Sequence, residues 1–294
     1  MPILIGTDPA SRAIHRLLTE IERRHDMTIL LAVEGGSRAH GFASPGSDFD
    51  VRFIYRQPIH RALALFPERD VIEIRPGVLP SPGFDVEFTG WSLEKTLKLG
   101  LVSNPQIAEF SRLPGERRPH AAYFAEPDFL ADLQDLGRAA APRAMAHYFR
   151  GIVKVNLKKY LEADQDPKGK RYLHTLQALM RARWLVTHHE RGWEFPLHFY
   201  DLRREVQLPE DVERTVEDLL AWKSGLANSA EPRRIPLLDA WIAEEMQALD
   251  RDVMTIPDGF VEPGLVEAIW RRCWPEVFGR VSEPEENADM TGGP

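Results

Sequence analysis

The sequence predicts an α+β protein, with a small mixed sheet and packed helices in its N-terminal part and an all-helical part after it. Three short segments, residues 27–36, 48–55 and 84–91, are rich in apolar, β-branched and aromatic residues and adjoin glycines, which is typical of strands. From residue 92 onward, apolar residues instead recur at helical spacing. This change of periodicity places the sheet first and the helices second.

A helix is expected before the first strand. Asp8 and Ser11 are alternative N-caps for it, and Pro9 suits a first helical turn. The apolar residues that then recur at helical spacing are Ile14, Leu17, Leu18 and Ile21. The segment 27–36 follows, and its sequence MTILLAVEGG predicts a buried strand that is ended by glycines.

The next elements alternate between turns and strands. Residues 37–42 are compatible with one or two helical turns, and 48–55 (DFDVRFIY) is a second strand because its side chains alternate. Residues 59–66 form a short helix or a connector. Residues 70–77 are a third strand or part of a hairpin, and 84–91 (FDVEFTGW) is the next strand by the same alternation.

Helix-start signals dominate the rest of the chain. Ser92 is an expected N-cap, and Asn104 is another, with Pro105 at the first helical position. The sequence PGERRP at 114–119 is rich in breakers and marks the expected domain boundary. Further helices are expected to begin near Pro127, Pro142, Lys170, Pro209, Ile235 and Pro263.

These signals divide the chain into a first domain over residues 1–115, a helical domain over 120–280 and a tail over 281–294. The tail is acidic and poor in apolar residues, so we expect it to be disordered. In the whole chain of 294 residues, by contrast, 43% of the residues are hydrophobic. This fraction is enough for a hydrophobic core.

Composition narrows the class of protein. The formal net charge of −8 does not indicate nucleic-acid binding, although an acidic protein can still carry a local basic patch that binds nucleic acid. The single cysteine, Cys273, rules out an internal disulfide framework and favours a reducing compartment. The N-terminus lacks the pattern of a signal peptide and no segment is long enough for a membrane span, so we expect a cytoplasmic protein with no membrane partner.

Two aspartates stand close together on the second predicted strand. Asp48 and Asp50 share a face with Arg52, because side chains alternate along a strand. Two adjacent carboxylates repel each other unless a cation lies between them. Hard oxygen ligands suit Mg²⁺ or Mn²⁺, and such a metal pair is a common device for nucleotidyl transfer. The alternative is a solvated strand entry without a ligand.

A glycine-rich turn precedes this strand. Gly36 and Ser37 lie eleven or twelve residues before Asp48, where backbone N–H groups, the serine hydroxyl and the start of a helical turn suit phosphate groups. Arg38 is a further candidate phosphate contact, although it is as compatible with the polar face of a short helix. Arg52 is equally compatible with a phosphate contact and with a salt bridge to the aspartates.

A third carboxylate is expected to complete a metal site. The strand at 84–91 offers Asp85 and Glu87, which lie two residues apart and on one face. Either side chain reaches the aspartate pair if this strand lies next to the strand that carries Asp48.

These motifs resemble the nucleotidyltransferase superfamily that includes DNA polymerase β, the CCA-adding enzymes and the aminoglycoside nucleotidyltransferases. Three further segments, at 36–55, 88–99 and 103–110, resemble more specifically the RNA-repair-pathway-associated nucleotidyltransferases of the polymerase β type. The resemblance implies a polymerase β-like catalytic domain at 1–115 and gives the third-ligand role to Glu87, with Asp85 in reserve. The family more commonly has aspartate at the position of Glu87.

Basic residues gather in the helical half. Lys159 is assigned to the bound nucleotide's phosphates, within a cluster formed by Lys158, Lys159, Lys168, Lys170 and Arg171. Such a cluster attracts a polyanion, although a solvated face is the simpler interpretation. Lys170, His174, Gln177 and Arg181 fall at helical spacing and form one polar face.

The resulting hypothesis is an enzyme that moves a nucleoside monophosphate from an NTP, ATP included, to a hydroxyl and releases pyrophosphate. Asp48, Asp50 and Glu87 are its expected catalytic residues and ligands of two Mg²⁺ or Mn²⁺ ions. The acceptor is an RNA end, a protein hydroxyl in an AMPylation reaction, or a small molecule. The rival hypothesis is a non-catalytic nucleotide-binding protein. The choice of NTP and the oligomeric state are left open.

Overall fold

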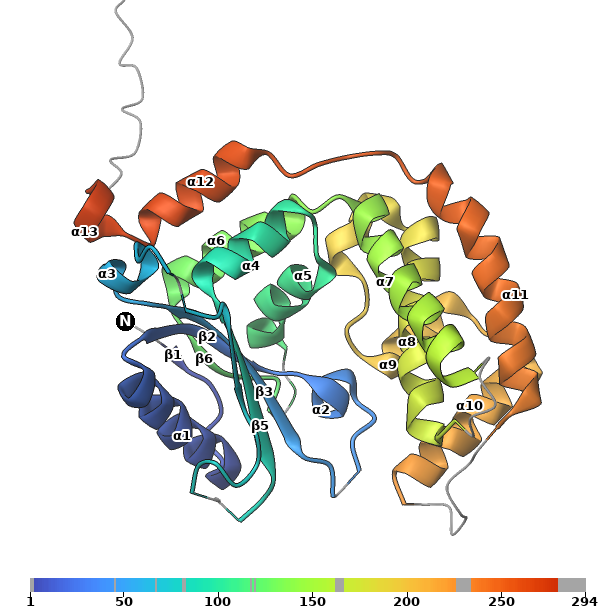
Figure 1. Cartoon of the computed structure of the whole chain (residues 1–294). Coiled ribbons are helices and arrows are strands. Elements are labelled where there is room, and N and C mark those ends of the chain that lie inside the picture. Colours follow the sequence, from blue (N-terminus) through green and yellow to red (C-terminus); the bar gives the residue numbers. More distant parts are fainter. Residues whose placement is uncertain are drawn as a thin grey trace, which may run out of the picture.

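The computed structural model contains one six-stranded mixed sheet with helices on both faces and a helical part beside it (Figure 1). The structure describes residues 3–44, 46–66, 68–80, 83–116, 118, 120–161, 167–225 and 234–279. The strands are β1 (Ile3–Leu4), β2 (Thr28–Glu34), β3 (Phe49–Arg56), β4 (Val71–Ile74), β5 (Val86–Ser92) and β6 (Ala122–Ala125). The helices are α1 (Pro9–His25), α2 (Gly36–His40), α3 (Ile59–Ala62), α4 (Leu93–Leu101), α5 (Pro105–Arg112), α6 (Pro127–Arg138), α7 (Pro142–Asn156), α8 (Gly169–Thr187), α9 (Phe199–Val206), α10 (Glu210–Lys223), α11 (Pro236–Asp252), α12 (Pro263–Arg272) and α13 (Pro275–Phe278).

The strand order is β1-β6-β2-β3-β5-β4. Strands β3 and β5 pair in parallel, whereas the other neighbouring strands of the described sheet pair antiparallel. Strand β4 is the antiparallel neighbour of β5, so the segment at 70–77 is the first arm of a hairpin. The α+β class with a mixed sheet is therefore confirmed.

The predicted helix starts are confirmed, and those of α1, α4 and α5 have side-chain caps. Asp8 rather than Ser11 caps α1, because its carboxylate accepts from the backbone N–H groups of Ala10 and Ser11 at 2.9 and 3.1 Å. Ser92 accepts from the Lys95 N–H at 3.1 Å and begins α4, and Asn104 caps α5. Helices α6, α7, α8, α10, α11 and α12 each begin within one residue of their predicted starts.

The sheet separates two apolar cores. On one face, Phe49, Val51 and Phe53 of β3 pack with α1 residues such as Ile14. On the other face, Ile54 joins a larger core that includes α4, α5 and α6 and continues into α7 and α8. Asp48, Asp50 and Arg52 have the parity of Ile54, so they lie on the face that turns toward the helical part.

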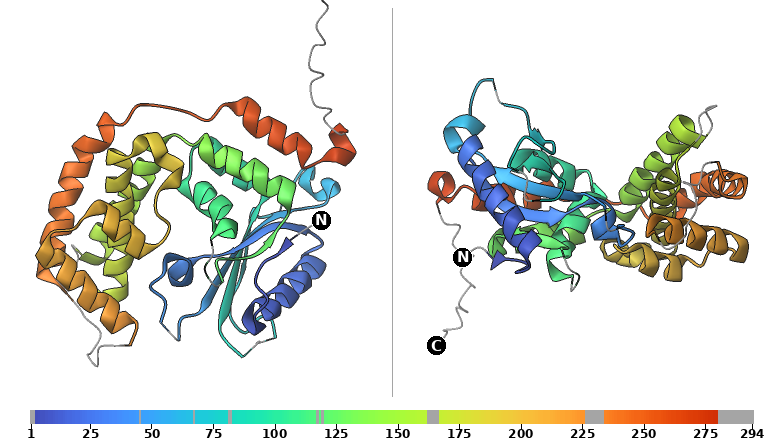
Figure 2. Two further views of the ribbon diagram at one scale, coloured as in Figure 1. Left: turned by 180° about the vertical axis from the view of Figure 1, so that it is seen from behind. Right: turned by 90° about the horizontal axis from the view of Figure 1, so that it is seen from below.

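The last helices return to the sheet. Helix α11 runs along the outside of the helical part, and the chain then crosses back so that α12 and α13 lie beside α3 and α4 (Figures 1 and 2). Arg272 of α12 forms an ion pair with Asp132 of α6, and the Arg56 guanidinium of β3 lies 5.1 Å from the Trp274 ring centroid. Helix α12 and the residues that follow it thus pack against the sheet part.

Two features differ from the expected division of the chain. Strand β6 lies beyond the expected boundary at 115, inside the stretch 120–280 that was expected to be helical, yet it pairs with β1 and β2 in the sheet. The sequence did not predict β1 either. Leu113–Gly115 forms a 3₁₀ turn that overlaps the start of the joint at 114–119, and the tail at 281–294 lies outside the described residues. The division into domains stays a prediction, but the sheet does not end at its boundary.

None of the described helices combines the length and apolar character needed to cross a membrane.

Candidate active site

A tight turn joins β2 to α2 against the start of β3. The Gly35 N–H donates to the Asp50 carbonyl at 2.6 Å, and Gly36 has φ of +54°, which favours glycine. A Cβ atom at Gly36 would lie 3.0 Å from Asp50 Oδ2, and one at Gly35 would lie 3.1 Å from Arg52 Cγ. The two glycines are therefore needed because the turn lies directly on the strand that carries the aspartates.

The parallel pairing of β3 and β5 brings the third acid into place. Asp50 is the register partner of Glu87, and the Phe49 N–H donates to the Asp85 carbonyl at 2.9 Å. Paired residues of neighbouring strands point to the same face, with their backbones about 4.8 Å apart. Glu87 therefore lies beside Asp50, and Asp85 lies one step further along, beside Asp48. Asp48 is exposed, and Asp50 and Glu87 are half-buried.

Two arginines tie these pieces together. Arg52 Nη2 lies 2.9 Å from Asp50 Oδ1 and donates to Oδ2 at 3.0 Å, so the salt bridge considered from the sequence is present. Arg38 Nε donates to the Asp48 carbonyl at 3.1 Å, its Nη2 donates to the Ser47 carbonyl, and its guanidinium lies 4.0 Å from the Phe49 ring centroid. Arg38 thus holds α2 against the entry of β3.

The acids provide only hard oxygen donors, which fit Mg²⁺ or Mn²⁺. Among the described residues, however, no three His, Cys, Asp or Glu side chains converge in a way that could hold a metal ion. The positive charge beside Asp50 comes from Arg52 instead. A metal site here requires the Asp50 carboxylate to exchange Arg52 for the ion and Glu87 to turn toward it.

A buried carboxyl that the sequence did not predict lies behind the turn. Glu34 is fully buried at the end of β2, where its Oε1 accepts from the Asp50 N–H at 2.9 Å and its Oε2 from the Tyr123 hydroxyl at 2.5 Å. Burial raises the pKa of Glu34 to about 8, against the smaller opposing effect of these hydrogen bonds. A charged residue at the end of an apolar run, directly before two glycines, was the available signal.

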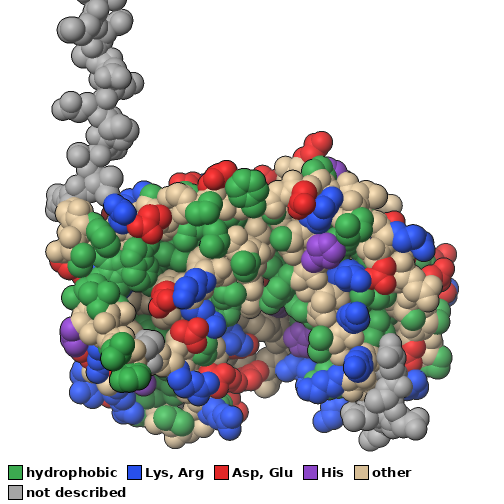
Figure 3. All heavy atoms as spheres, turned by 45° about the horizontal axis from the view of Figure 1, so that its top comes forward, with side chains coloured by type: hydrophobic (Ala, Val, Ile, Leu, Met, Phe, Trp, Pro, Cys, Tyr) green, Lys and Arg blue, Asp and Glu red, His purple; other side chains and the backbone are tan. Residues whose placement is uncertain are grey.

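A pocket of about 200 Å³ opens between the turn and the helical part. Gly35, Gly36 and Arg52 form its sheet side, and residues of α5, α7 and α8 form its other walls. Figure 3 shows the molecule hollowed between the two parts, with Lys and Arg side chains on both sides of the hollow.

A buried chain of charges connects the two sides of this pocket. His40 Nε2 lies 2.5 Å from Glu109 Oε1, and Arg181 Nη1 lies 3.2 Å from Glu109 Oε2. Burial by itself would raise the pKa of Glu109, but the charges of Arg181 and His40 outweigh it and lower the pKa to about 2. The carboxylate of α5 is therefore ionised and joins α2 to α8.

The predicted phosphate contacts are not all gathered at this pocket. Gly36 and Arg52 line it, whereas Ser37, Arg38 and Lys159 do not. Lys159 lies in the π-helical turn Leu157–Leu161, where it is exposed and its Nζ lies 5.2 Å from the Tyr160 ring centroid.

The polar face of α8 points inward rather than into solvent. Gln177 and Arg181 are only 5% and 4% exposed, and both line the pocket together with His174. The sequence identified this polar face but did not predict that these two residues are buried.

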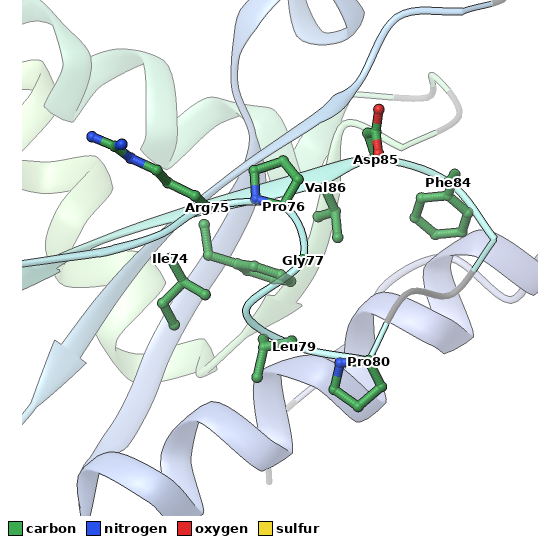
Figure 4. A pocket seen from close by; sticks show the side chains of 10 residues that line it. Ile74, Arg75, Pro76, Gly77, Leu79, Pro80, Phe84, Asp85 and Val86 are labelled. Atoms are coloured by element: carbon green, nitrogen blue, oxygen red, sulfur yellow. The ribbon is translucent and has the colours of Figure 1, made fainter.

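A second cavity of about 150 Å³ lies under the connection between β4 and β5. Figure 4 shows its mostly apolar lining, with Asp85 turned away from Phe84 and Leu79. It contains none of the predicted phosphate contacts, so the candidate active site is the pocket beside the Gly35–Gly36 turn and the acids of β3 and β5.

A mixed sheet with a glycine–serine turn, followed by acids on two adjacent parallel strands, defines a nucleotidyltransferase domain of the polymerase β type. The chain belongs to the RNA repair pathway DNA polymerase beta family, whose family model matches residues 10–260. It is 31% identical over 233 residues to the uncharacterized protein YcgL of Bacillus subtilis (strain 168). The aligned region covers 79% of this chain and 84% of that protein.

Among solved structures, the chain is similar to a nucleotidyltransferase-like protein from Exiguobacterium sibiricum 255-15. The identity is 14% and the TM-score 0.29, with 91% of this chain and 80% of that chain covered. At these values the similarity carries no further conclusion.

Proposed function

We propose that the protein transfers a nucleoside monophosphate from an NTP to a hydroxyl acceptor and releases pyrophosphate. One observation carries the proposal: the register that pairs Asp50 with Glu87 directly beside the Gly36 turn. This arrangement puts hard oxygen ligands next to backbone N–H groups that suit a polyphosphate. Family membership supports the same chemistry.

Each group has a distinct role in this mechanism. Gly36 and Ser37 bind the β- and γ-phosphates, and Arg52 lies beside them. Asp48, Asp50 and Glu87 would hold two Mg²⁺ or Mn²⁺ ions, which supply charge neutralisation at the phosphates when bound. Arg38 and Lys159 remain predicted phosphate contacts.

The reaction itself is a simple exchange of bonds at phosphorus. A carboxylate oxygen of Glu87 accepts the proton of the acceptor hydroxyl. The hydroxyl oxygen forms a bond to the α-phosphorus, and the bond from the α-phosphorus to the bridging oxygen of the β-phosphate breaks. Most of the rate acceleration comes from positioning and charge neutralisation, as expected for phosphoryl chemistry.

An RNA end is the acceptor that we favour. Lys and Arg side chains lie on both sides of the hollow in Figure 3, and the family description names an RNA repair pathway. A protein hydroxyl and a small molecule are the other acceptors. RNA binding to such residues weakens steeply with salt, whereas small-molecule binding depends on it much less.

The test is transfer of label from each α-³²P-labelled NTP in Mg²⁺ or Mn²⁺, with and without short RNAs. We expect label on RNA from the wild type and a loss of at least about 100-fold in Asp50→Asn, because the variant loses a charged ligand. Glu94→Gln is the matched control, since Glu94 pairs with Lys98 at an exposed site. Label on the protein itself would identify self-AMPylation. The proposal would be refuted if neither the wild type nor the two variants transferred label from any NTP to RNA or to protein.

A further inference from the structure

Several residues that line the pocket beside the turn carry buried polar atoms without a partner in the protein. Among the buried side-chain atoms of the described residues, Gln177 Nε2, Arg181 Nε and His40 Nδ1 have no hydrogen-bond partner, and all three residues line this pocket. Gln177 and Arg181 are more than nine-tenths buried. Unpaired buried donors are costly and uncommon in folded proteins, so a ligand with acceptor atoms is the expected partner.

The charge of the pocket argues against a polyanion as that ligand. Both guanidiniums that line it are already paired with carboxylates, Arg181 with Glu109 and Arg52 with Asp50. Burial, followed by the nearby charge of His40, lowers the pKa of His174 to about 4, so that its ring is uncharged at neutral pH. Neither guanidinium is therefore free of a counter-charge, and His40 shares the carboxylate of Glu109 with Arg181.

Apart from Gln106, the remaining walls are apolar and partly aromatic. They consist of Phe110 of α5, Tyr148, Phe149 and Ile152 of α7, and Ala178 of α8. Aromatic walls around a few fixed polar groups are typical of pockets that bind flat, uncharged rings. Such a ring carries both the acceptor atoms that the donors need and the faces that the walls can cover.

We propose that this pocket binds the base of the NTP and that the Gln177 amide contacts the edge of that base. The inference rests on the proposed function, because the sheet side of the pocket is the Gly35–Gly36 turn to which the phosphates are assigned. One nucleotide then spans the site, with its phosphates at the turn and its base against α8. Arg181 is held by Glu109 and by the Leu197 carbonyl at 3.1 Å, so its guanidinium has a fixed position.

The experiment compares the binding of the four NTPs with that of inorganic tripolyphosphate, by calorimetry in Mg²⁺ with no acceptor. We expect Gln177→Leu to weaken the binding of the preferred NTP about tenfold, because one hydrogen bond to the base is lost. Tripolyphosphate binding should not change. Gln177→Glu should alter the order of affinities among the four NTPs, because an acceptor replaces a donor at the base edge. Gln247→Leu, at an exposed position of α11, is the matched control.

The folding of Gln177→Leu is followed by thermal unfolding. Leucine has a similar size and removes a donor without a partner, so Tm should stay the same or rise. Two outcomes would overturn the base site and leave the proposed function intact. The wild type could bind tripolyphosphate as tightly as every NTP, or Gln177→Leu could weaken the binding of NTP and of tripolyphosphate equally. A wild type that binds neither ligand would refute both.

Discussion

Two buried carboxyl groups lie next to the two ends of α2, Glu34 before its N-cap and Glu109 against His40, and they carry different charges. Glu34, on the sheet side, is fully buried with a pKa raised to about 8, whereas Glu109, on the helical side, is 6% exposed with a pKa lowered to about 2. Burial by itself raises the pKa of both groups. The difference comes from the partners, since Glu34 has a hydroxyl and a backbone N–H, and Glu109 has Arg181 and His40.

This difference shows how the site separates its charges. A second negative charge beneath Asp50 would repel it, and the neutral Glu34 instead fixes the backbone of β3 by a hydrogen bond. The ionised Glu109 lies against His40 at the end of α2, where it links this helix to the positive charge of α8. On the sheet side, an uncharged carboxyl group thus fixes the backbone of β3. On the helical side, an ionised carboxylate fixes α2 and α8 through its positively charged partners.

The strongest test of this comparison removes the charge of Glu109. We expect Glu109→Gln to lower the free energy of unfolding by about 3–5 kcal/mol, because Arg181 would stay buried without its counter-charge. Urea unfolding measures the loss. Glu94→Gln, which breaks the exposed pair with Lys98, should cost less than about 0.5 kcal/mol. Equal losses in the two variants would show that the buried pair contributes no more than a surface pair.

The dependence of stability on pH sharpens the comparison, in a metal-free buffer with chelator. Between pH of about 4.5 and 8, folded Glu34 binds more protons than unfolded Glu34, so stability falls as the pH rises through this window. Between about 2 and 4.5, unfolded Glu109 binds more protons, so stability falls as the pH drops through that window. Each group contributes at most about 1.4 kcal/mol per pH unit.

Glutamine variants separate the two windows. Glu34→Gln should flatten the dependence above pH 4.5 and leave the lower window unchanged, and Glu109→Gln should do the reverse. Urea midpoints measured at intervals of one pH unit are the readout. A wild type whose stability rises steadily from pH 5 to pH 8, with the same rise in Glu34→Gln, would contradict the neutral state of Glu34.

The sheet side could be predicted from the sequence better than the helical side. The shared face of Asp48 and Asp50 follows from the period of a strand, and the need for glycine at 35 and 36 follows from the turn. The pairing of Asp50 with Glu87 could not be derived in the same way, because alternation does not specify which strands are neighbours. The resemblance to a known family, rather than periodicity, selected Glu87.

The helical side depends on contacts between distant parts of the chain. Glu109 is 69 residues from His40 and 72 from Arg181, and no local pattern predicts that they meet. The polar face of α8 was visible in the sequence, but periodicity does not distinguish a polar face in solvent from one that lines a pocket. Strand β6 was missed because it has only four residues and follows a segment rich in breakers.

The smallest expected effect on stability, and a large one on activity, concerns the turn itself. Gly36→Ala should cost about 1–2 kcal/mol of stability for its positive φ, and its Cβ would also press on the Asp50 carboxylate at 3.0 Å. Gly77→Ala is the matched control, because Gly77 also has positive φ, at +87°, but no atom within 4 Å of the added Cβ. We therefore expect similar losses in Tm but a selective loss of nucleotidyl transfer and tripolyphosphate binding in Gly36→Ala. If both variants kept full transfer activity, close contact between the turn and Asp50 would be irrelevant to the chemistry, and the phosphates would have to bind elsewhere along the hollow.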